Sequence, residues 1–331
     1  MNKEINNNHK VRVPGELYLL TTSIIWGAAF VVQKVAMDIL EPFTFTAVRY
    51  FLGGLLLIPV IILFQKMNDK KDKKPNSAKR QEYSKKTLFW GGIVCGAVLC
   101  LGGNFQQFGL VTSAAGKTGF ITTLYIVIVP VFGLLVFRKR VPWLVWVGVV
   151  LGVFGLYFLS MKAGDFSMER GDFLVFIGAF FWAAHILAVD FLAPKVDAVK
   201  LSCLQFIWAG VFSSIFMFIM ETPNIMEILS CWFPILFTSV FVVGVAFTFQ
   251  TIGQKTTDPA VTSLILSLEA VFGVLAGMLF LSERMTGREL LGCALMFTAV
   301  ILTQLPDKKE REIKRLAKVE KISLGETTDD Q

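Results

Sequence analysis

The stretch FQQFGLVTSAAGKTGFITTLYIVIVPVFG at residues 105–133 returns as FQTIGQKTTDPAVTSLILSLEAVFGVLAG at residues 249–277, an offset of 144 positions. Residues 15–54 return in the same way 156 positions later. Identical pairs include Phe105/Phe249, Gln106/Gln250, Gly109/Gly253, Thr112/Thr256, Leu124/Leu268, Gly133/Gly277, Gly148/Gly292 and Leu151/Leu295, and also Gly15/Gly171, Trp26/Trp182, Ala28/Ala184 and Gly54/Gly210. Two copies of one unit in a very apolar chain indicate a membrane transporter.

Composition places this chain in the membrane. Of its 331 residues, 54% are hydrophobic and only 17% are charged, too few to cover the exterior of a soluble domain. The net charge is +7, and the lysines gather at the two ends and in residues 65–87 beside apolar stretches, without interleaved aromatic residues. This pattern favours contact with anionic lipid and argues against nucleic-acid binding.

Cysteine and histidine usage gives no sign of a metal, a cofactor or a disulfide framework. The five cysteines lie in or beside apolar stretches without a CxxC pair, and the chain has two histidines. The first fifteen residues lack the apolar core of a cleaved signal peptide. We therefore expect the first hydrophobic span to remain as an anchor.

Ten apolar segments are each about long enough to cross a bilayer as a helix, which takes about 20 residues. We expect an all-α integral membrane protein with ten transmembrane helices. The predicted spans are 17–37, 43–64, 88–111, 117–137, 141–161, 171–192, 201–220, 231–254, 260–281 and 287–305.

Basic residues in the short loops predict the orientation. The N-terminus, the loop 65–87 with its nine Lys and Arg residues, the turn Arg138–Arg140 and the C-terminal tail fall on one side. The connections on the other side mix basic with acidic residues, as around Glu169 and Glu283. Both termini are therefore expected in the cytoplasm, in a multi-pass protein of the cytoplasmic membrane.

Five spans per copy is an odd number, so the second copy enters the membrane from the opposite face. The loop charges agree, because the basic loop 65–87 corresponds to the acidic region around Glu221 and Glu227. We expect two inverted-topology repeats. The predicted units are a cytoplasmic segment 1–15, a first repeat 16–161, a second, inverted repeat 171–305 and a charged cytoplasmic tail 306–331.

Several motifs resemble the EamA-type family of the drug/metabolite transporter superfamily across about residues 15–305. They are Trp26-Gly27, Pro42 with Arg49, VTSAAGKTGFITTLYIVIVP (Val111 to Pro130) and LILSLEAVFGVLAGMLFLSER (Leu264 to Arg284). The family usually has Glu-Pro where this chain has Glu269-Ala270, which removes a proline kink from the ninth span. The resemblance implies two inverted five-helix bundles, a central substrate cavity and alternating access.

Two ionisable residues in the second copy are candidates for coupling to protons or other cations. Glu269 lies near the middle of the ninth span, where a low dielectric favours the neutral carboxyl and lets a proton load and leave. His185 lies one turn after Trp182 and could bind substrate or relay a proton. The alternatives are a carboxyl hydrogen-bonded to the backbone and a histidine that serves only in packing.

Arg49 and its counterpart Gln205 make one position polar in both copies. Arg49 lies about two turns into the second span, where it could contact a substrate carboxylate, serve a gate or a structural pair, or snorkel to the membrane surface. Lys117, at the start of the fourth span, is expected to be an interfacial charge or part of an extracellular gate.

Trp26 and Trp182 occupy equivalent positions about ten residues into their spans, too deep for simple interfacial anchors. If the repeats face each other, the two rings lie on opposite sides of a central cavity, where they could sandwich an apolar or cationic substrate.

Uncharged polar residues complete the predicted cavity. Gln106 and Gln250 form a symmetric pair with Asn104 nearby, and their amides could bond either a substrate or a neighbouring helix. Tyr125 lies at the position that Glu269 fills in the second copy, so the two copies differ where coupling chemistry is expected.

These patterns predict a secondary active transporter that exports an amino acid or a related small metabolite by alternating access, with proton coupling. An importer of a cationic or nucleoside-like metabolite is the alternative that the tryptophan pair suggests. A receptor or scaffold that does not transport is the alternative of another class. The sequence has no HExxH helix, paired catalytic aspartates or GxxxxGK[ST] loop, so we expect no enzyme.

Overall fold

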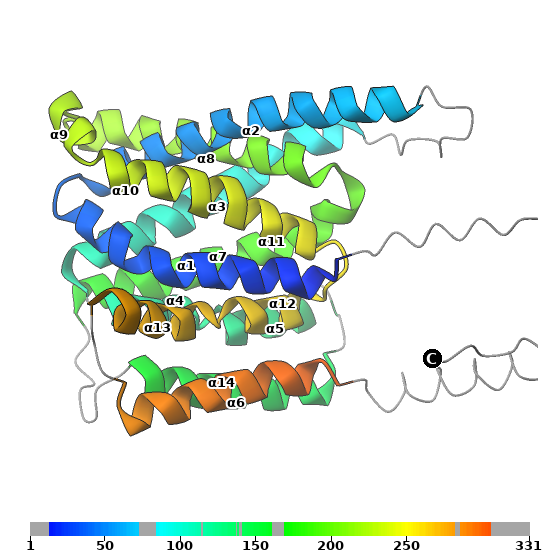
Figure 1. Ribbon diagram of the computed structural model, residues 1–331, viewed down its shortest axis with the longest axis vertical. Helices are drawn as coiled ribbons and strands as arrows, with labels where there is room; N and C mark the ends of the chain where they lie inside the picture. Colours follow the sequence, from blue (N-terminus) through cyan, green and yellow to red (C-terminus); the bar gives the residue numbers. More distant parts are fainter. Residues whose placement is uncertain are drawn as a thin grey trace, which may run out of the picture.

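The structure is a computed structural model that describes residues 13–72, 84–113, 115–136, 138, 141–160, 169–281 and 285–305. Throughout these ranges the regular secondary structure is helical, and the helices run side by side along a common direction (Figure 1). Residues 1–12, residues 73–83 of the basic loop, Lys139, Arg140, Glu283, Arg284 and the tail 306–331 lie outside the described residues. The charge and topology predictions made for them stay predictions.

The helices follow one another with short connections. In order they are α1 (Gly15–Met37), α2 (Pro42–Asp72), α3 (Lys85–Thr112), α4 (Ala115–Thr122), α5 (Tyr125–Leu135), α6 (Trp143–Ser160), α7 (Arg170–Leu192), η1 (Ala193–Lys195), α8 (Ala198–Met220), α9 (Ile225–Ser230), α10 (Trp232–Phe237), η2 (Thr238–Phe247), α11 (Thr248–Gly253), α12 (Pro259–Leu266), α13 (Glu269–Leu281) and α14 (Gly287–Thr303).

Within the described ranges, nine helical stretches are long and apolar enough to cross a membrane. They are Gly15–Met37, Pro42–Met67, Lys85–Thr112, Ala115–Leu135, Trp143–Ser160, Arg170–Lys195, Ala198–Met220, Trp232–Gly253 and Pro259–Ala276. They correspond to the first nine predicted spans. The tenth corresponds to α14, whose 17 residues fall short of the roughly 20 that a full crossing takes, so the count of ten stays a prediction.

The fourth and ninth predicted spans, 117–137 and 260–281, are each interrupted by a short break. The first breaks between α4 and α5 at Thr123-Leu124, and the other breaks between α12 and α13 at Ser267-Leu268. Thr123 Oγ1 donates to the carbonyl oxygens of Gly119 and Phe120, both at 2.9 Å. Ser267 Oγ likewise donates to the Leu264 carbonyl at 2.8 Å. These hydroxyls compete with backbone N–H groups for the carbonyls, and the helix tightens into i,i+3 turns without a proline at the break.

The eighth predicted span, 231–254, also departs from a single regular helix. Between α10 and α11 the chain forms the wide helix η2. Thr238 Oγ1 and Ser239 Oγ each donate at 2.7 Å to carbonyls of the preceding turn, those of Pro234 and Ile235. Hydroxyl bonds of this kind relax the regular ladder, and wide turns often mark functional sites.

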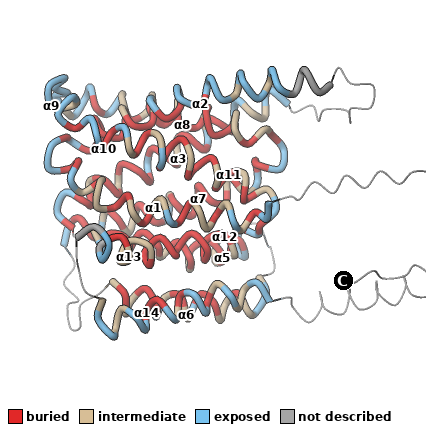
Figure 2. Tube along the Cα trace, in the orientation of Figure 1, coloured by how far each residue is buried: buried red, intermediate tan, exposed pale blue. Residues whose placement is uncertain are grey.

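The helices pack in layers whose centre is the most buried part of the molecule. At one edge α6 packs on α14, at the other α2 packs on α8, and α3 packs on both α7 and α8. Between the edges α1 contacts α13, η2, α11 and α12 (Figure 1). Buried residues follow these central helices (Figure 2). The outer helices expose apolar side chains such as Leu55, Ile219 and Leu290. An apolar outer surface of this kind suits hydrocarbon.

One glycine brings α1 unusually close to the start of α13. A Cβ atom at Gly27 would lie 2.5 Å from the carbonyl oxygen of Glu269 and 2.7 Å from the backbone nitrogen of Gly273. Only glycine permits this approach, which holds the backbone of Glu269 against the middle of α1. The same turn of α1 carries Trp26, so this contact also places the tryptophan beside the carboxyl.

Candidate functional site

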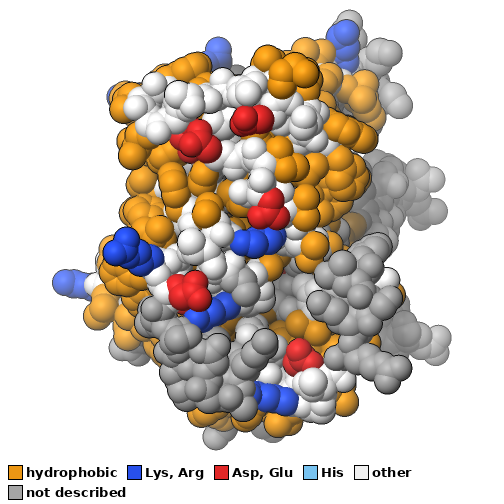
Figure 3. Space-filling model, turned by 90° about the vertical axis from the view of Figure 1, so that its left-hand side faces the viewer, with side chains coloured by type: hydrophobic (Ala, Val, Ile, Leu, Met, Phe, Trp, Pro, Cys, Tyr) orange, Lys and Arg blue, Asp and Glu red, His pale blue; other side chains and the backbone are white. Residues whose placement is uncertain are grey.

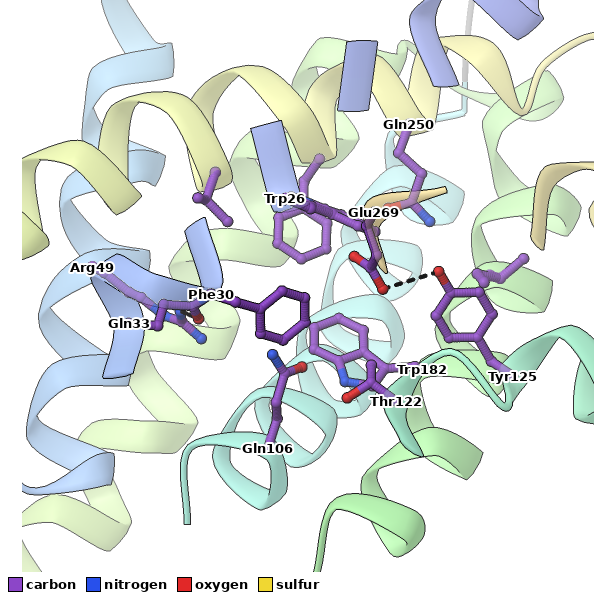
Figure 4. A pocket seen from close by; sticks show the side chains of 13 residues that line it. Trp26, Phe30, Gln33, Arg49, Gln106, Thr122, Tyr125, Trp182, Gln250 and Glu269 are labelled. Atoms are coloured by element: carbon purple, nitrogen blue, oxygen red, sulfur yellow. Dashed lines mark hydrogen bonds between the residues drawn. The ribbon is translucent and has the colours of Figure 1, made fainter. Parts of the chain in front are cut away.

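A cavity lies between the central helices. Its wall combines a guanidinium and a carboxyl group, three amides and several aromatic rings (Figure 4). The lining residues are Trp26, Phe30 and Gln33 from α1, Arg49 from α2, Gln106 from α3, Thr122 from α4, Tyr125 from α5, Trp182 and Ile186 from α7, Val242 and Phe247 from η2, Gln250 from α11 and Glu269 from α13. Such a mixed wall suits a small ligand with charged groups on an apolar body.

The two broken helices meet in this cavity. Tyr125 begins α5 and Glu269 begins α13, and the tyrosine hydroxyl donates to Glu269 Oε1 at 3.2 Å (Figure 4). Both side chains are buried, with 2% and 3% of their surface exposed. Among the described residues no cation forms an ion pair with this carboxyl. A carboxyl group in such a place can gain or lose a proton or accept a bond from a bound ammonium.

Arg49 is the second charged group of the wall, and only 3% of its surface is exposed. It therefore does not snorkel. Its Nη1 donates to Gln33 Oε1 at 2.5 Å, and the guanidinium lies 5.0 Å from the ring centroids of both Phe45 and Tyr50. These partners are neutral, and Arg49 Nε has no hydrogen-bond partner among the described residues. A buried cation with neutral partners is costly, and an anionic ligand would relieve that cost.

Gln33 holds Arg49 in place from α1. Its Oε1 accepts the bond from Arg49 and another from Gln107 Nε2 at 2.6 Å. The amide oxygen thereby ties α2 and α3 to α1. This arrangement fixes the guanidinium at the cavity wall.

Three aromatic rings form the middle of the wall. The Trp26 ring centroid lies 4.7 Å from that of Phe247 and 6.4 Å from that of Trp182, and Trp182 stacks on Phe247 at 5.8 Å. A flat ligand between two rings needs about 7 Å between them, twice a van der Waals contact. In this conformation Trp26 and Trp182 are too close to sandwich a ring, so they offer one continuous aromatic surface instead.

Several polar atoms of the wall have no hydrogen-bond partner within the described part of the chain. They are the indole nitrogens of Trp26 and Trp182, Thr122 Oγ1 and Gln250 Oε1. Buried polar atoms usually find partners, so unpaired ones around a cavity indicate a ligand or water. The set offers two N–H donors and two oxygen acceptors.

Three predicted site residues lie behind the wall and do not line the cavity. His185 Nε2 and Gln205 Oε1 are 3.0 Å apart, and the imidazole meets the rings of Trp182 and Phe247 edge to face. Asn104 Nδ2 donates to the Cys100 carbonyl at 2.8 Å and to Ser213 Oγ at 2.9 Å. His185 thus contacts two rings of the wall, whereas Asn104 links α3 to α8. The roles predicted for the three residues stay predictions.

The cavity gathers the other predicted residues, which are Trp26, Arg49, Gln106, Tyr125, Trp182, Gln250 and Glu269. The sequence patterns did not single out six wall residues: Phe30, Gln33, Thr122, Ile186, Val242 and Phe247. Helical spacing could have found five of them. Phe30 and Gln33 lie four and seven residues after Trp26, Ile186 lies four after Trp182, and Thr122 and Phe247 lie three before Tyr125 and Gln250. Val242 carries no such signal, because the wide turns of η2 change the spacing there.

Metal ligation has no evident place in the described part of the chain. No group of three or more His, Cys, Asp or Glu residues there is arranged to hold a metal ion. The five cysteines are free and buried.

Comparison with known proteins places the chain in a family. The model of the EamA-like transporter family matches residues 13–161 and again residues 169–305. A protein of Archaeoglobus fulgidus named as an uncharacterized transporter is 30% identical over 296 residues, covering 89% of this chain and 87% of the relative. An uncharacterized transporter of Methanothermobacter thermautotrophicus is 23% identical over 304 residues, covering 88% of this chain and 86% of the relative.

A solved structure shares the fold. It aligns with a TM-score of 0.71 at 18% identity, covering 90% of this chain and 98% of the other. The relatives are named as transporters and not as enzymes. The resemblance seen in the sequence is thus confirmed: the chain belongs to the EamA-like transporter family of the drug/metabolite transporter superfamily and is a multi-pass membrane transporter.

Proposed function

We propose that this chain is a secondary carrier that exports a small zwitterionic metabolite, an amino acid or a related compound, in exchange for protons. The observation that carries the proposal is the separation of two buried charged groups in one cavity. Arg49 and Glu269 both line it, yet Arg49 bonds to Gln33 and Glu269 to Tyr125 instead of to each other. A zwitterion between them would place its carboxylate on the guanidinium and its ammonium on the carboxylate.

The aromatic surface would take the body of such a substrate. In the view of Figure 4, Arg49 and Gln33 lie to one side and Tyr125 to the other, with the rings of Trp26, Phe30 and Trp182 between them. Burial of an apolar side chain on these rings would add affinity, and the unpaired indole N–H groups could bond an acceptor on the substrate. Specificity would then come from the charged groups at the two sides of the cavity, and affinity would come from the aromatic rings between them.

Exchange with protons follows from competition at Glu269. The carboxyl binds either a proton or the substrate ammonium, because a protonated carboxyl no longer attracts a cation. The site would return protonated after it releases substrate. An inward proton gradient then drives the substrate outward, and for this reason we propose export over import.

Alternating access is proposed to arise from two inverted repeats, 16–161 and 171–305, each with five helices. The offsets of 144 and 156 residues and the two separate matches of the family model support this division. Inverted repeats give two near-equivalent conformations that face opposite sides. With the basic residues of loop 65–87 inside, both termini lie in the cytoplasm and the chain lies in the cytoplasmic membrane.

A ligand series tests the zwitterion proposal. Purified protein is screened by thermal shift against L-amino acids, their amides, which lack the carboxylate, and their N-acetyl forms, which lack the ammonium. A ligand stabilises the state that it binds, so the amino acids should raise Tm and both blocked series should do so less. A positive compound is then tested for counterflow in proteoliposomes. Equal stabilisation by the amides or the N-acetyl forms would contradict the proposal.

The aromatic cluster supports a second candidate, an importer of a cationic or nucleoside-like metabolite. Trp26, Trp182 and Phe247 form a surface that suits a quaternary ammonium or a nucleobase. Choline and adenosine belong in the same screen, and a Tm rise with either one alone would favour this candidate. Binding without counterflow in sealed vesicles would indicate a receptor or scaffold instead of a carrier.

A further inference from the structure

A buried ion pair joins three helices at one end of the molecule. Lys117 Nζ lies 2.6 Å from Asp172 Oδ2, and 16% of the lysine side chain and none of the aspartate side chain is exposed. Ser113 Oγ donates to the other carboxylate oxygen at 2.6 Å, and the Glu169 backbone N–H donates to Oδ2 at 2.8 Å. The group ties the end of α3 to the beginnings of α4 and α7, and we name this end the Lys117 end.

The same three helices form part of the cavity wall. Gln106 precedes Ser113 by seven residues, Thr122 follows Lys117 by five and Trp182 follows Asp172 by ten. At 1.5 Å per residue, these wall residues lie about 10, 8 and 15 Å along their helices from the ion-paired group. The ion-paired group therefore lies between the cavity and the surface of the molecule at the Lys117 end. While it holds, α3, α4 and α7 cannot separate to open a route there.

A second lysine strengthens the closure at this end. Lys34, near the end of α1, donates through Nζ to the carbonyl oxygens of Leu110 at 2.5 Å and Val111 at 3.2 Å. A cation at the C-terminal end of a helix is favoured by the helix dipole. This face of the molecule, seen in Figure 3, carries both acidic and basic side chains among hydrophobic ones.

The opposite end has the same helix crossing with different side chains. There the end of α11 meets the beginnings of α12 and α1, and we name it the Thr257 end. A Cβ at Gly171 would lie 2.7 Å from the Gly109 carbonyl oxygen, and one at Gly15 would lie 2.6 Å from the Gly253 carbonyl oxygen. At the repeat offsets, Ser113, Lys117 and Asp172 correspond to Thr257, Val261 and Glu16. Valine cannot form an ion pair, so these three described residues make no equivalent link.

We propose that Ser113, Lys117 and Asp172 form a latch that holds the Lys117 end closed and biases the resting transporter toward conformations open at the Thr257 end. The bias exists because, at the equivalent crossing of the Thr257 end, Thr257, Val261 and Glu16 cannot form the ion pair that Lys117 and Asp172 form. When the ion pair breaks, the free-energy difference between the two states decreases. The population that is open at the Lys117 end then rises, and the population that is open at the Thr257 end falls. This inference rests on the alternating access proposed above.

Two matched reporters can read each end separately. Thr118 lies one residue inside Lys117 on α4, Thr262 is its counterpart on α12, and both are fully buried. Thr118→Cys and Thr262→Cys are made singly, placed in nanodiscs without substrate and treated with a polar maleimide. The parent chain measures the background from the five buried native cysteines. Because no transport is measured, the result is independent of which substrate, if any, the cavity carries.

Lys117→Met should raise the labelling rate of Thr118→Cys by about fivefold or more, and fivefold is the lower limit of typical coupling between conformations. The same substitution should lower the labelling rate of Thr262→Cys. The exchanged pair Lys117→Asp with Asp172→Lys should return both rates toward the parent. Val261→Lys, which supplies a partner for Glu16, should also raise labelling of Thr118→Cys. Lys66→Met, which removes an exposed lysine elsewhere, should change neither rate.

Two results would overturn the latch. One is an unchanged rate at Thr118→Cys in a Lys117→Met protein that elutes and melts as a folded species. The other is a rise at both reporters, which would mean general loosening and a purely structural ion pair. If Lys117→Met does not fold, the exchanged pair and Val261→Lys still decide the question.

Discussion

The two broken helices, α4–α5 and α12–α13, have the same backbone arrangement but carry different side chains after the break. Both breaks fall at the same place in the repeat, Thr123-Leu124 and Ser267-Leu268, and in both a hydroxyl bonds the preceding turn. The residue after the break is Tyr125 in one and Glu269 in the other. The hydroxyls accompany the break in both copies, and the side chains that follow it differ. One copy presents a hydroxyl donor, and the other presents a carboxyl that we propose exchanges its partner.

The largest effect should come from replacing the carboxyl of Glu269 by a neutral group, because its counterpart Tyr125 carries a neutral side chain. Glu269→Gln keeps the shape of the side chain and removes the group that we propose exchanges protons. We expect transport driven by a pH gradient in proteoliposomes to be abolished, while exchange of substrate for substrate persists. Glu227→Gln, at an exposed carboxyl on α9, is the matched control. Full pH-driven transport by Glu269→Gln would remove this residue from coupling.

Arg49→Gln gives α2 the same residue that α8 has at the equivalent position, Gln205. A hydrogen bond to a charged group contributes about 1.5–3 kcal/mol, so the Kd of a carboxylate substrate should rise roughly 10- to 100-fold. The unliganded protein should melt at the same temperature or higher, because a buried cation held by neutral partners has been removed. A merely structural arginine would instead lower Tm. Isothermal titration and thermal unfolding separate the two effects.

The helices that pack against the two broken helices, α1 and α7, differ as well. α1 carries Gly27 against α13, whereas the corresponding residue of α7 is Ala183. Gly27→Ala would force its Cβ to about 2.5 Å from the Glu269 carbonyl oxygen, and overpacking of this kind costs about 1–3 kcal/mol. We expect a lower Tm. Gly133→Ala, where a Cβ meets no atom within 4 Å, should leave Tm unchanged. Equal effects of the two substitutions would contradict the close approach.

Much of the fold could be predicted from the sequence, because length and polarity decide where helices cross a membrane. The all-helical architecture and the first nine spans follow from apolar runs such as Trp143–Ser160. The breaks could not be predicted, because Thr123 and Ser267 look like ordinary polar residues of a helix. Only their bonds to the preceding carbonyls show that they end one. The prediction relied on proline as the signal for a kink, and the chain makes both breaks without one.

The candidate cavity could be predicted only in part. Symmetric pairs pointed to Trp26 and Trp182, and charge inside a span pointed to Arg49 and Glu269, all of which line it. Helical spacing from Trp26 and Trp182 selects Gln33 but also selects His185, so spacing alone does not decide which polar residues face the cavity. His185 and Gln205 therefore satisfy each other behind the wall, whereas Gln33 lies on it and bonds Arg49.

The smallest effect should come from removing the hydroxyl of Tyr125, which begins α5 after the break of the first copy. Tyr125→Phe removes the hydroxyl that donates to Glu269 Oε1 at 3.2 Å and leaves the ring in place. A single hydrogen bond contributes about 0.5–1.5 kcal/mol, so initial transport rates should fall about 2- to 12-fold with pH-gradient coupling retained. Such a result means that the tyrosine positions the carboxyl while the carboxyl alone carries the proton. Loss of coupling as complete as in Glu269→Gln would show that the two residues act as one unit, and the separate roles of the two broken helices would be wrong.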